Sequence, residues 1–321
     1  MANDLAALQF QPLSDGAYAA FRTAAHPDSP VTPDDLARLA AGREASEHHT
    51  QEGAFLDGTL AGAVTTGRPR LDNHDGWLDV SVTTPSGQGP LANTLLRHGL
   101  STVASAGAHT AVTRVQEDWW EREFLLARGW AEFDRMWLST LDLRTLDFAA
   151  FAAEEARALS GGVTIRPLSD LGGWDADPER HYTLIHALLS AVPSTRPIQV
   201  WPYDLWRTRM AALNLDPRGF MVALASDGQW IGTTQLAQTI PARPGTLHNG
   251  LTGVLAPWRG RGLGLALKLA AARAALARGF THSRTGNHAV NRPMLAINER
   301  LGCVREAAVI TLTRAVGSGQ L

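Results

Sequence analysis

The chain has 321 residues, of which 45% are hydrophobic and 19% are charged, and this balance excludes a disordered or fibrous protein. Its length suits two domains of about 160 residues, each able to bury a core. No run reaches the roughly 18 apolar residues of a membrane helix, and the polar start at Met1 lacks a signal-peptide pattern, so we expect a cytoplasmic protein without membrane contact. The only cysteine, Cys303, excludes an internal disulfide and a cysteine-built zinc site, and we expect no bound metal.

The net charge of −2 hides an uneven distribution. Residues 1–161 carry 12 Arg and 22 acidic residues, net −10, whereas residues 162–321 carry 16 Arg, one Lys and 9 acidic residues, net +8. A basic half suits an anionic ligand and an acidic half suits a cationic one, although attraction between the halves explains the pattern equally well. Because the arginines are scattered, with no Lys/Arg tract, we expect no nucleic-acid partner.

Similar segments recur in the same order in both halves of the chain. They are a strand and turn ending in Pro-Leu-Ser-Asp at 8–15 and 163–170, a hairpin turning on Asp57-Gly58 and on Asp227-Gly228, and a Gly-containing turn before a strand at 128–143 and 301–312. Three echoes at similar separations indicate a tandem duplication. We therefore predict two domains, residues 1–160 and 161–321, joined near the Ser160-Gly161-Gly162 linker.

The first half contains a clearly marked helix, then a strand over 77–82 and a further helix from residue 91. Thr32-Pro33 is typical of an N-cap and a first helical residue, which predicts a helix to about residue 41. The connection at 84–90 has neither arginine nor lysine, and Pro90 lacks an N–H. This strand-helix junction is therefore a poor place for a phosphate group.

The second half predicts helices over 180–191 and 203–213, joined by a proline-bearing loop that contains Trp201. Together with Trp206, this loop could form a wall of a ligand pocket, although core packing is the commoner role for tryptophan. The elements that follow are strands at 220–225, 230–237 and 247–255, a helix at 263–278 and a strand at 281–285. The helix has an apolar face spaced by four, three and four residues, namely Leu265, Leu269, Ala272 and Leu276.

The turn before this helix, Arg259-Gly-Arg-Gly-Leu-Gly264, has the character of a phosphate loop. A helix N-terminus offers free N–H groups and partial positive charge, and Arg259, Arg261 and Lys268 add charge around it. A dinucleotide loop would need glycine where the chain has Leu265, and a Walker loop would need Lys-Ser/Thr directly after Gly264. Both of these loop types are therefore disfavoured.

A second motif follows at residues 286–302. Asn291 can cap a helix that has Pro293 in its first turn, and Met294, Ile297 and Leu301 form its core face before Gly302. Together the Arg259-x-x-Gly262-x-Gly264 loop and this helix resemble the pyrophosphate loop and the following helix of the GCN5-related N-acetyltransferase (GNAT) family. The resemblance covers residues 160–321, and for residues 1–160 it rests on the repeat.

The resemblance implies an α/β (α+β) protein of two tandem GNAT-like domains, each a mixed, mostly antiparallel central sheet flanked by helices. It implies acetyl-coenzyme A (acetyl-CoA) as cosubstrate, and direct transfer of the acetyl group to a primary amine of a small-molecule acceptor by a monomer or homodimer. The first copy lacks the charged loop, so we expect it not to hold coenzyme A. A non-catalytic acyl-CoA-binding sensor or scaffold is the alternative.

The family pattern also assigns roles to individual residues. The resemblance implies that the backbone of Val254 and Leu255 contacts the acetyl carbonyl and the pantetheine arm. It places the pyrophosphate on Arg259, Gly260, Arg261, Gly262, Leu263 and Gly264. Asn291 would contact the pantetheine, and Asn287 would add a second amide contact or serve only a local turn.

Many family members have a tyrosine that protonates the leaving thiolate, and this chain has Asn298 there. An asparagine can donate a hydrogen bond but cannot deliver a proton. A base would help more, since the acceptor amine is mostly protonated at neutral pH. The strand offers His248, Asn249 and Thr252, of which only His248 titrates near neutrality, although a lone histidine is more often structural. The acidic first half could supply the base instead.

Overall fold

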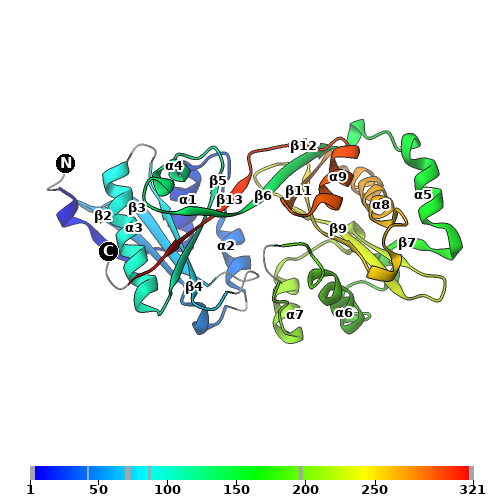
Figure 1. Ribbon diagram of the computed structural model, residues 1–321, viewed down its shortest axis with the longest axis horizontal. Coiled ribbons are helices and arrows are strands. Elements are labelled where there is room, and N and C mark those ends of the chain that lie inside the picture. Colours follow the sequence, from blue (N-terminus) through cyan, green and yellow to red (C-terminus); the bar gives the residue numbers. More distant parts are fainter. Residues whose placement is uncertain (1–3, 42, 69–73, 86–87, 195–197, 318–321) are drawn as a thin grey trace. The chain divides into compact units, whose positions relative to one another are not determined.

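The computed structural model describes residues 4–41, 43–68, 74–85, 88–194 and 198–317 (Figure 1). The chain forms two compact units, unit 1 from Met1–Arg135 with Ala307–Leu321, and unit 2 from Met136–Glu306. These units are defined by packing, and the repeat boundary expected at residues 160 and 161 stays a prediction. No helix in the described ranges is both long and apolar enough to cross a membrane.

The sheet of unit 1 has the strand order β1-β2-β3-β4-β5-β13, and among its described strand pairs only β4 and β5 are parallel. Its strands are β1 (Gln9–Pro12), β2 (Thr50–Leu56), β3 (Thr59–Gly67), β4 (Trp77–Thr83), β5 (Thr110–Gln116) and β13 (Val309–Ala315). Its helices are α1 (Asp15–Ala25), α2 (Pro33–Ala40), α3 (Gly89–Ser105) and α4 (Trp120–Leu126). The predicted Asp57-Gly58 hairpin joins β2 to β3, and both turn residues have positive φ, 48° and 76°.

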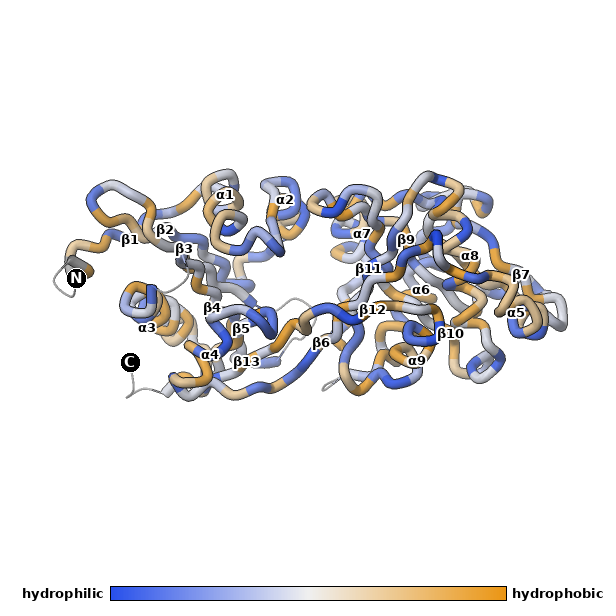
Figure 2. The backbone as a smooth tube through the Cα atoms, turned by 90° about the horizontal axis from the view of Figure 1, so that it is seen from above, coloured by the Kyte–Doolittle hydropathy of each residue, from blue (hydrophilic) through white to orange (hydrophobic). Residues whose placement is uncertain are grey.

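Two helices predicted for unit 1 are confirmed. Helix α2 begins with a capping box, because the Thr32 hydroxyl accepts from the Asp35 N–H (3.1 Å) and the Asp35 carboxylate accepts from the Thr32 N–H (2.9 Å). Helix α3 buries one face, including Leu95, against β3 and β4. Figure 2 shows hydrophobic and hydrophilic stretches alternating around α3, as expected for a helix with one buried side.

The sheet of unit 2 has the order β6-β11-β10-β9-β8-β7, with β12 also pairing with β6, and within the described ranges only β10 and β11 are parallel. Its strands are β6 (Ala131–Asp142), β7 (Thr164–Pro167), β8 (Phe220–Leu224), β9 (Trp230–Thr239), β10 (Thr246–Val254), β11 (His282–His288) and β12 (Val304–Arg305). Its helices are α5 (Ala152–Ala158), α6 (Pro178–Leu189), α7 (Tyr203–Ala212), α8 (Leu263–Ala277) and α9 (Arg292–Arg300). The predicted fold class, mixed and mostly antiparallel sheets with flanking helices, is confirmed.

Each unit contains a strand from the other half of the sequence. Strand β6 lies in the first repeat, yet its residues 136–142 pair with β11 in unit 2. Strand β13 lies in the second repeat, yet it pairs with β5 in unit 1. The expected sequence repeats and the packing units therefore do not coincide.

Both faces of the unit 2 sheet are covered by helices (Figure 1). In strand β8 the side chains alternate, so that Met221 and Ala223 join a core cluster around α8, while Phe220 and Val222 join a cluster with α6 and α7. Most residues of β8 and of its neighbour β9 are buried. Such strands are typical of a sheet that lies between two helical layers.

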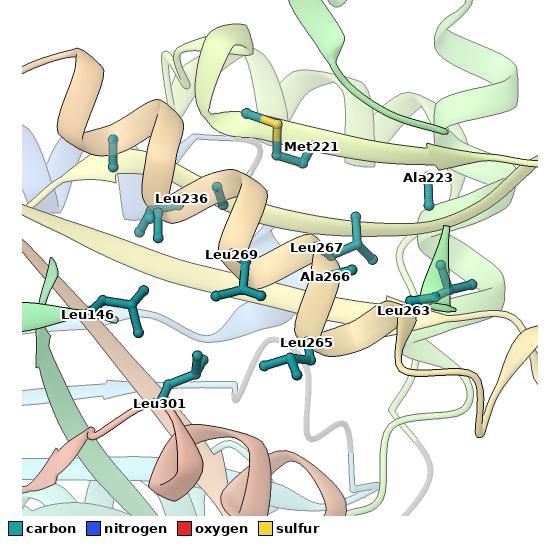
Figure 3. Packing of buried hydrophobic residues seen from close by; sticks show 14 of the residues in the cluster. Leu146, Met221, Ala223, Leu236, Leu263, Leu265, Ala266, Leu267, Leu269 and Leu301 are labelled. Atoms are coloured by element: carbon teal, nitrogen blue, oxygen red, sulfur yellow. The ribbon is translucent and has the colours of Figure 1, made fainter. Parts of the chain in front are cut away.

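Helix α8 is buried over most of its circumference. The predicted face of Leu265, Leu269 and Ala272 is buried as expected, but Leu263 and Leu267 are buried as well. Figure 3 shows α8 side chains directed toward several neighbouring elements. The helix packs on β8, β9 and β10 and also against α5, so the amphipathic pattern expected from the sequence was too narrow.

The cluster on the opposite face resolves the role of the two tryptophans. Trp206 is 4% exposed and belongs to this core, and Trp201 packs against it. His181 lies in the same cluster, 1% exposed, between the rings of Trp174, Trp206 and Phe220. Neither of its ring nitrogens has a hydrogen-bond partner among the described residues, and burial lowers the pKa of His181 to about 4.

Because His181 is buried in its neutral form, we expect the folded protein to lose stability in acid. The variant His181→Phe should not show this loss. The unfolded chain binds a proton near pH 6.5 and the folded chain only near pH 4, so stability is complete above pH 6.5 and falls as pH drops through that window, by about 3 kcal/mol in total. Urea unfolding followed by tryptophan fluorescence at pH 7.5 and 4.5 measures the loss. The exposed His186 on the same helix provides the control, His186→Phe, which should leave it unchanged. An equal pH dependence in His181→Phe and the parent protein would contradict this account.

Candidate functional site

The loop between β10 and α8 is built on two glycines in the left-handed region. After β10 ends, residues 256–258 form a single 3-10 turn, and Gly260 and Gly262 then have φ of +75° and +83°. Gly262 is the N-cap of α8. A side chain at either position would be strained, so the glycine spacing noted in the sequence sets the path of this turn.

The loop concentrates unused hydrogen-bond donors. Within the described part of the chain, no backbone N–H of residues 260–265 donates to a protein acceptor. Arg259 and Arg261 are exposed beside them, and the Arg261 guanidinium lies 4.6 Å from the centre of the Trp258 ring. These free N–H groups, the helix dipole and two guanidinium groups form a combination that suits an anion.

Lys268 does not contribute to this charge, and the expectation that it would was wrong. Its side chain is buried, 8% exposed, and its Nζ donates to the Oδ1 of Asn249 on β10. Asn249 in turn donates to the Thr234 hydroxyl (3.2 Å) and the Gln235 carbonyl (3.0 Å). Burial lowers the pKa of Lys268 to about 8, because the charged form loses its hydration.

Strands β10 and β11 separate next to the loop. They pair from Thr246 with His282 up to Asn249 with Thr285, and β10 then continues unpaired on that side to Val254. The Leu255 N–H donates to the Ile231 carbonyl (2.8 Å), so it is occupied within the sheet. Val254, one residue earlier, directs its N–H and C=O to the open side, and its carbonyl accepts from Arg259 Nε (3.0 Å).

The asparagines in and after β11 adopt roles that the sequence did not predict. Asn291 is at the N-cap position of α9, but its side chain makes no capping hydrogen bond, so the capping role expected for its amide was wrong. Asn298 is 2% exposed and donates through Nδ2 to the Oδ1 of Asn287 (2.6 Å). The two residues expected to act separately are therefore bonded to each other.

A small pocket with both apolar and polar walls lies beside α8. It has a volume of about 20 Å³, enough for one water molecule, and its lining includes Lys268, Asn249, Asn298 and Cys303. The Oδ1 of Asn298 is buried without a hydrogen-bond partner among the described atoms. Burial raises the pKa of Cys303, so its thiol stays protonated at neutral pH, consistent with the apolar filler expected from the sequence.

His248 lies on β10 opposite Arg284 in the parallel register, and its side chain keeps an exposed surface. Crowding by neighbouring protein atoms, and then the Arg284 charge, lower the pKa of His248 below its usual value.

Arg284 itself pairs with Glu306 (2.8 Å), as does Arg243 (2.9 Å). Burial raises the pKa of Glu306, but hydrogen bonds from Arg284 and Thr140 outweigh it and hold this carboxylate ionised. The pairing of Glu306 with these two arginines was not predicted, because Glu306 lies far from both of them in the sequence.

A known family matches the segment of the chain that contains this loop. Residues 183–302, which include the loop, the separating strands and α9, match the acetyltransferase (GNAT) family. The chain contains a GNAT domain. No curated protein sequence matches the chain significantly.

Solved structures extend the likeness to the whole chain. A tandem GNAT protein from the clavulanic acid biosynthesis pathway is 18% identical, with a TM-score of 0.71, over 98% of this chain and 100% of that one. A GCN5-related N-acetyltransferase from Sphaerobacter thermophilus gives 18% and 0.68 over 98% and 97%, and a GNAT acetyltransferase from Colwellia psychrerythraea gives 14% and 0.59 over 96% and 99%. At these identities the likeness shows the fold, and the tandem GNAT fold predicted from the repeat is confirmed.

The buried Lys268–Asn249 pair should couple strongly. Asn249→Leu leaves an ammonium group buried without its acceptor and should destabilise the GNAT domain by roughly 2–4 kcal/mol. The double variant Asn249→Leu with Lys268→Met should recover part of that loss, because it removes both polar partners. Unfolding free energies of the two single variants and the double variant measure the coupling. Strictly additive effects would show that the pair contributes nothing.

Proposed function

We propose that the GNAT domain binds acetyl-CoA and transfers its acetyl group to a primary amine of a small-molecule acceptor. The observation that carries this proposal is the anion site of residues 259–265, where free N–H groups and two arginines meet at the start of a fixed helix. That site suits the pyrophosphate of coenzyme A. Val254 supports the proposal, because its N–H lies on the side of β10 that β11 leaves open.

In the proposed reaction the amine nitrogen attacks the thioester carbonyl, the C–S bond breaks and coenzyme A leaves as a thiolate. A thiol of pKa ~8.5 leaves well without a proton donor, so Asn298 is not needed as an acid. We assign it instead to positioning Asn287, to which it is bonded. The amine, with a pKa of ~10.4, is only about one part in 10³ neutral at pH 7, so a base matters more. We assign that role to His248, whose side chain is exposed on β10 and whose lowered pKa favours the neutral form that accepts a proton.

Calorimetric titration with acetyl-CoA tests the binding half of the proposal. We expect one site per chain, weakened at least about 100-fold in Arg259→Ala with Gly262→Pro, because the change removes a guanidinium contact, an N–H and a φ of +83° that proline cannot adopt. Arg144→Ala, an exposed arginine of the same unit paired with Asp142, should bind normally. No binding by the parent protein, or two equal sites, would contradict the proposal.

The alternative is an acyl-CoA-binding sensor or scaffold without turnover. The burial of Asn298 at the position of the family's tyrosine, and the absence of a carboxylate from β10, favour it. A coupled assay of free-thiol release with a panel of primary amines separates the two functions. Sustained turnover on any amine excludes the sensor, whereas tight acetyl-CoA binding with no thiol release on the whole panel supports it.

The same assay tests His248. If it is the base, kcat/KM should fall at acidic pH, with a midpoint below the usual histidine pKa, since protonation of the imidazole removes the acceptor of the proton. His248→Gln should lower kcat about 10²-fold or more and abolish that acidic limb. His186→Gln, at an exposed histidine on α6, serves as the control. A normal rate and pH profile in His248→Gln would assign the proton to another acceptor.

A further inference from the structure

Unit 1 contains a cavity that the proposed function does not use. It has a volume of about 270 Å³ and is lined only by unit 1 residues. Strands β4 and β5 pair from Trp77 with Thr110 to Asp79 with Val112 and then separate. The cavity begins at this separation, between residues 80–83 of β4 and 113–115 of β5, and extends to α1, α2, α3 and α4.

The walls are mainly apolar. Val80 and Val82 project from β4, Leu96 from α3, and Leu36 and Leu39 from α2. Leu39 is 56% exposed, which is unusual for a leucine and leaves an apolar edge beside the cavity. At roughly 30 Å³ per water molecule, the volume suits a ligand of about ten non-hydrogen atoms.

Charged groups of opposite sign meet at the same cavity. His26, the C-cap residue of α1, pairs with Glu121 of α4 (2.9 Å), and the two side chains are only 6% and 7% exposed. Glu121 Oε2 and Arg22 Nη1 are buried, and neither has a hydrogen-bond partner among the described residues. The Arg22 guanidinium is held 4.7 Å from the centre of the Trp119 ring.

Leaving both groups unsatisfied is costly, because a buried donor or acceptor without a partner loses its hydration and gains nothing. One ligand could satisfy both if it carried an anionic acceptor for Arg22 and a cationic donor for Glu121. A coenzyme does not fit this description, since the β4–α3 connection has no arginine or lysine for phosphates.

We propose that this cavity binds a small zwitterion with an apolar side chain, that is, an apolar α-amino acid of the size of leucine or phenylalanine. Its carboxylate pairs with Arg22, its ammonium group with Glu121, and its side chain occupies the apolar walls between β4 and α2. This site is separate from the anion site of unit 2 and does not depend on it.

Titration of the full chain with four probes tests the assignment. L-leucine carries both charges, 4-methylpentanoate only the carboxylate, 3-methylbutylamine only the ammonium group, and glycine both charges without the side chain. Leucine should bind at least about tenfold more tightly than each of the other three. Equal binding of 4-methylpentanoate, or no binding of any amino acid, would overturn the proposal, and this comparison requires no variant.

Variants then locate the site. Arg22→Met should weaken leucine binding at least about tenfold and leave 3-methylbutylamine unchanged, while Glu121→Gln should do the same for leucine and spare 4-methylpentanoate. Arg38→Met, at an arginine of α2 paired with Asp35, is the matched control. The unit 2 variant Arg259→Ala with Gly262→Pro should bind leucine normally. Loss of leucine binding in that variant, or retention in both unit 1 variants, would place the amino acid elsewhere.

Discussion

The burial of α8 is the constraint on which the rest of unit 2 depends. The helix is apolar on nearly every side and is held between strands β8–β10 and helix α5. Each buried leucine contributes about 1.5–3 kcal/mol, whereas an anion at a helix N-terminus contributes about 0.3–1 kcal/mol, up to about 2. The core therefore sets where the helix begins, and the free N–H groups of residues 260–265 are in place before any ligand arrives.

The same burial forces polar side chains under the helix to satisfy one another. Lys268 finds its acceptor in Asn249, and Asn298 finds one in Asn287. The lysine and asparagines that suggested ligand contacts in the sequence therefore form hydrogen bonds within the protein. The positive charge at the loop therefore comes from Arg259 and Arg261, whose side chains are exposed.

The two units share a strand arrangement but surround it with different chemistry. In each, one parallel strand pair separates partway along its length, β4 from β5 and β10 from β11. In unit 2 the separation lies beside a glycine-arginine turn that suits an anion. In unit 1 it opens into a cavity where Arg22 Nη1 and Glu121 Oε2 are buried without hydrogen-bond partners among the described residues. A duplicated scaffold can therefore carry two sites of different specificity, because the ligand contacts come from side chains and turns and not from the strand order.

The sequence by itself determined the features that depend on near neighbours. The Thr32 capping box, the Asp57-Gly58 hairpin and the positive-φ glycines of the loop are set by a few adjacent residues, and the order of strands and helices over residues 220–302 followed from periodicity. Only the tertiary structure decided which strand completes each sheet and that Lys268 is buried. It also decided that Asn298 bonds to Asn287, and that Arg22 and Glu121 line the same cavity. These outcomes depend on groups distant in the chain, and their energies come from burial and pairing that no local pattern encodes.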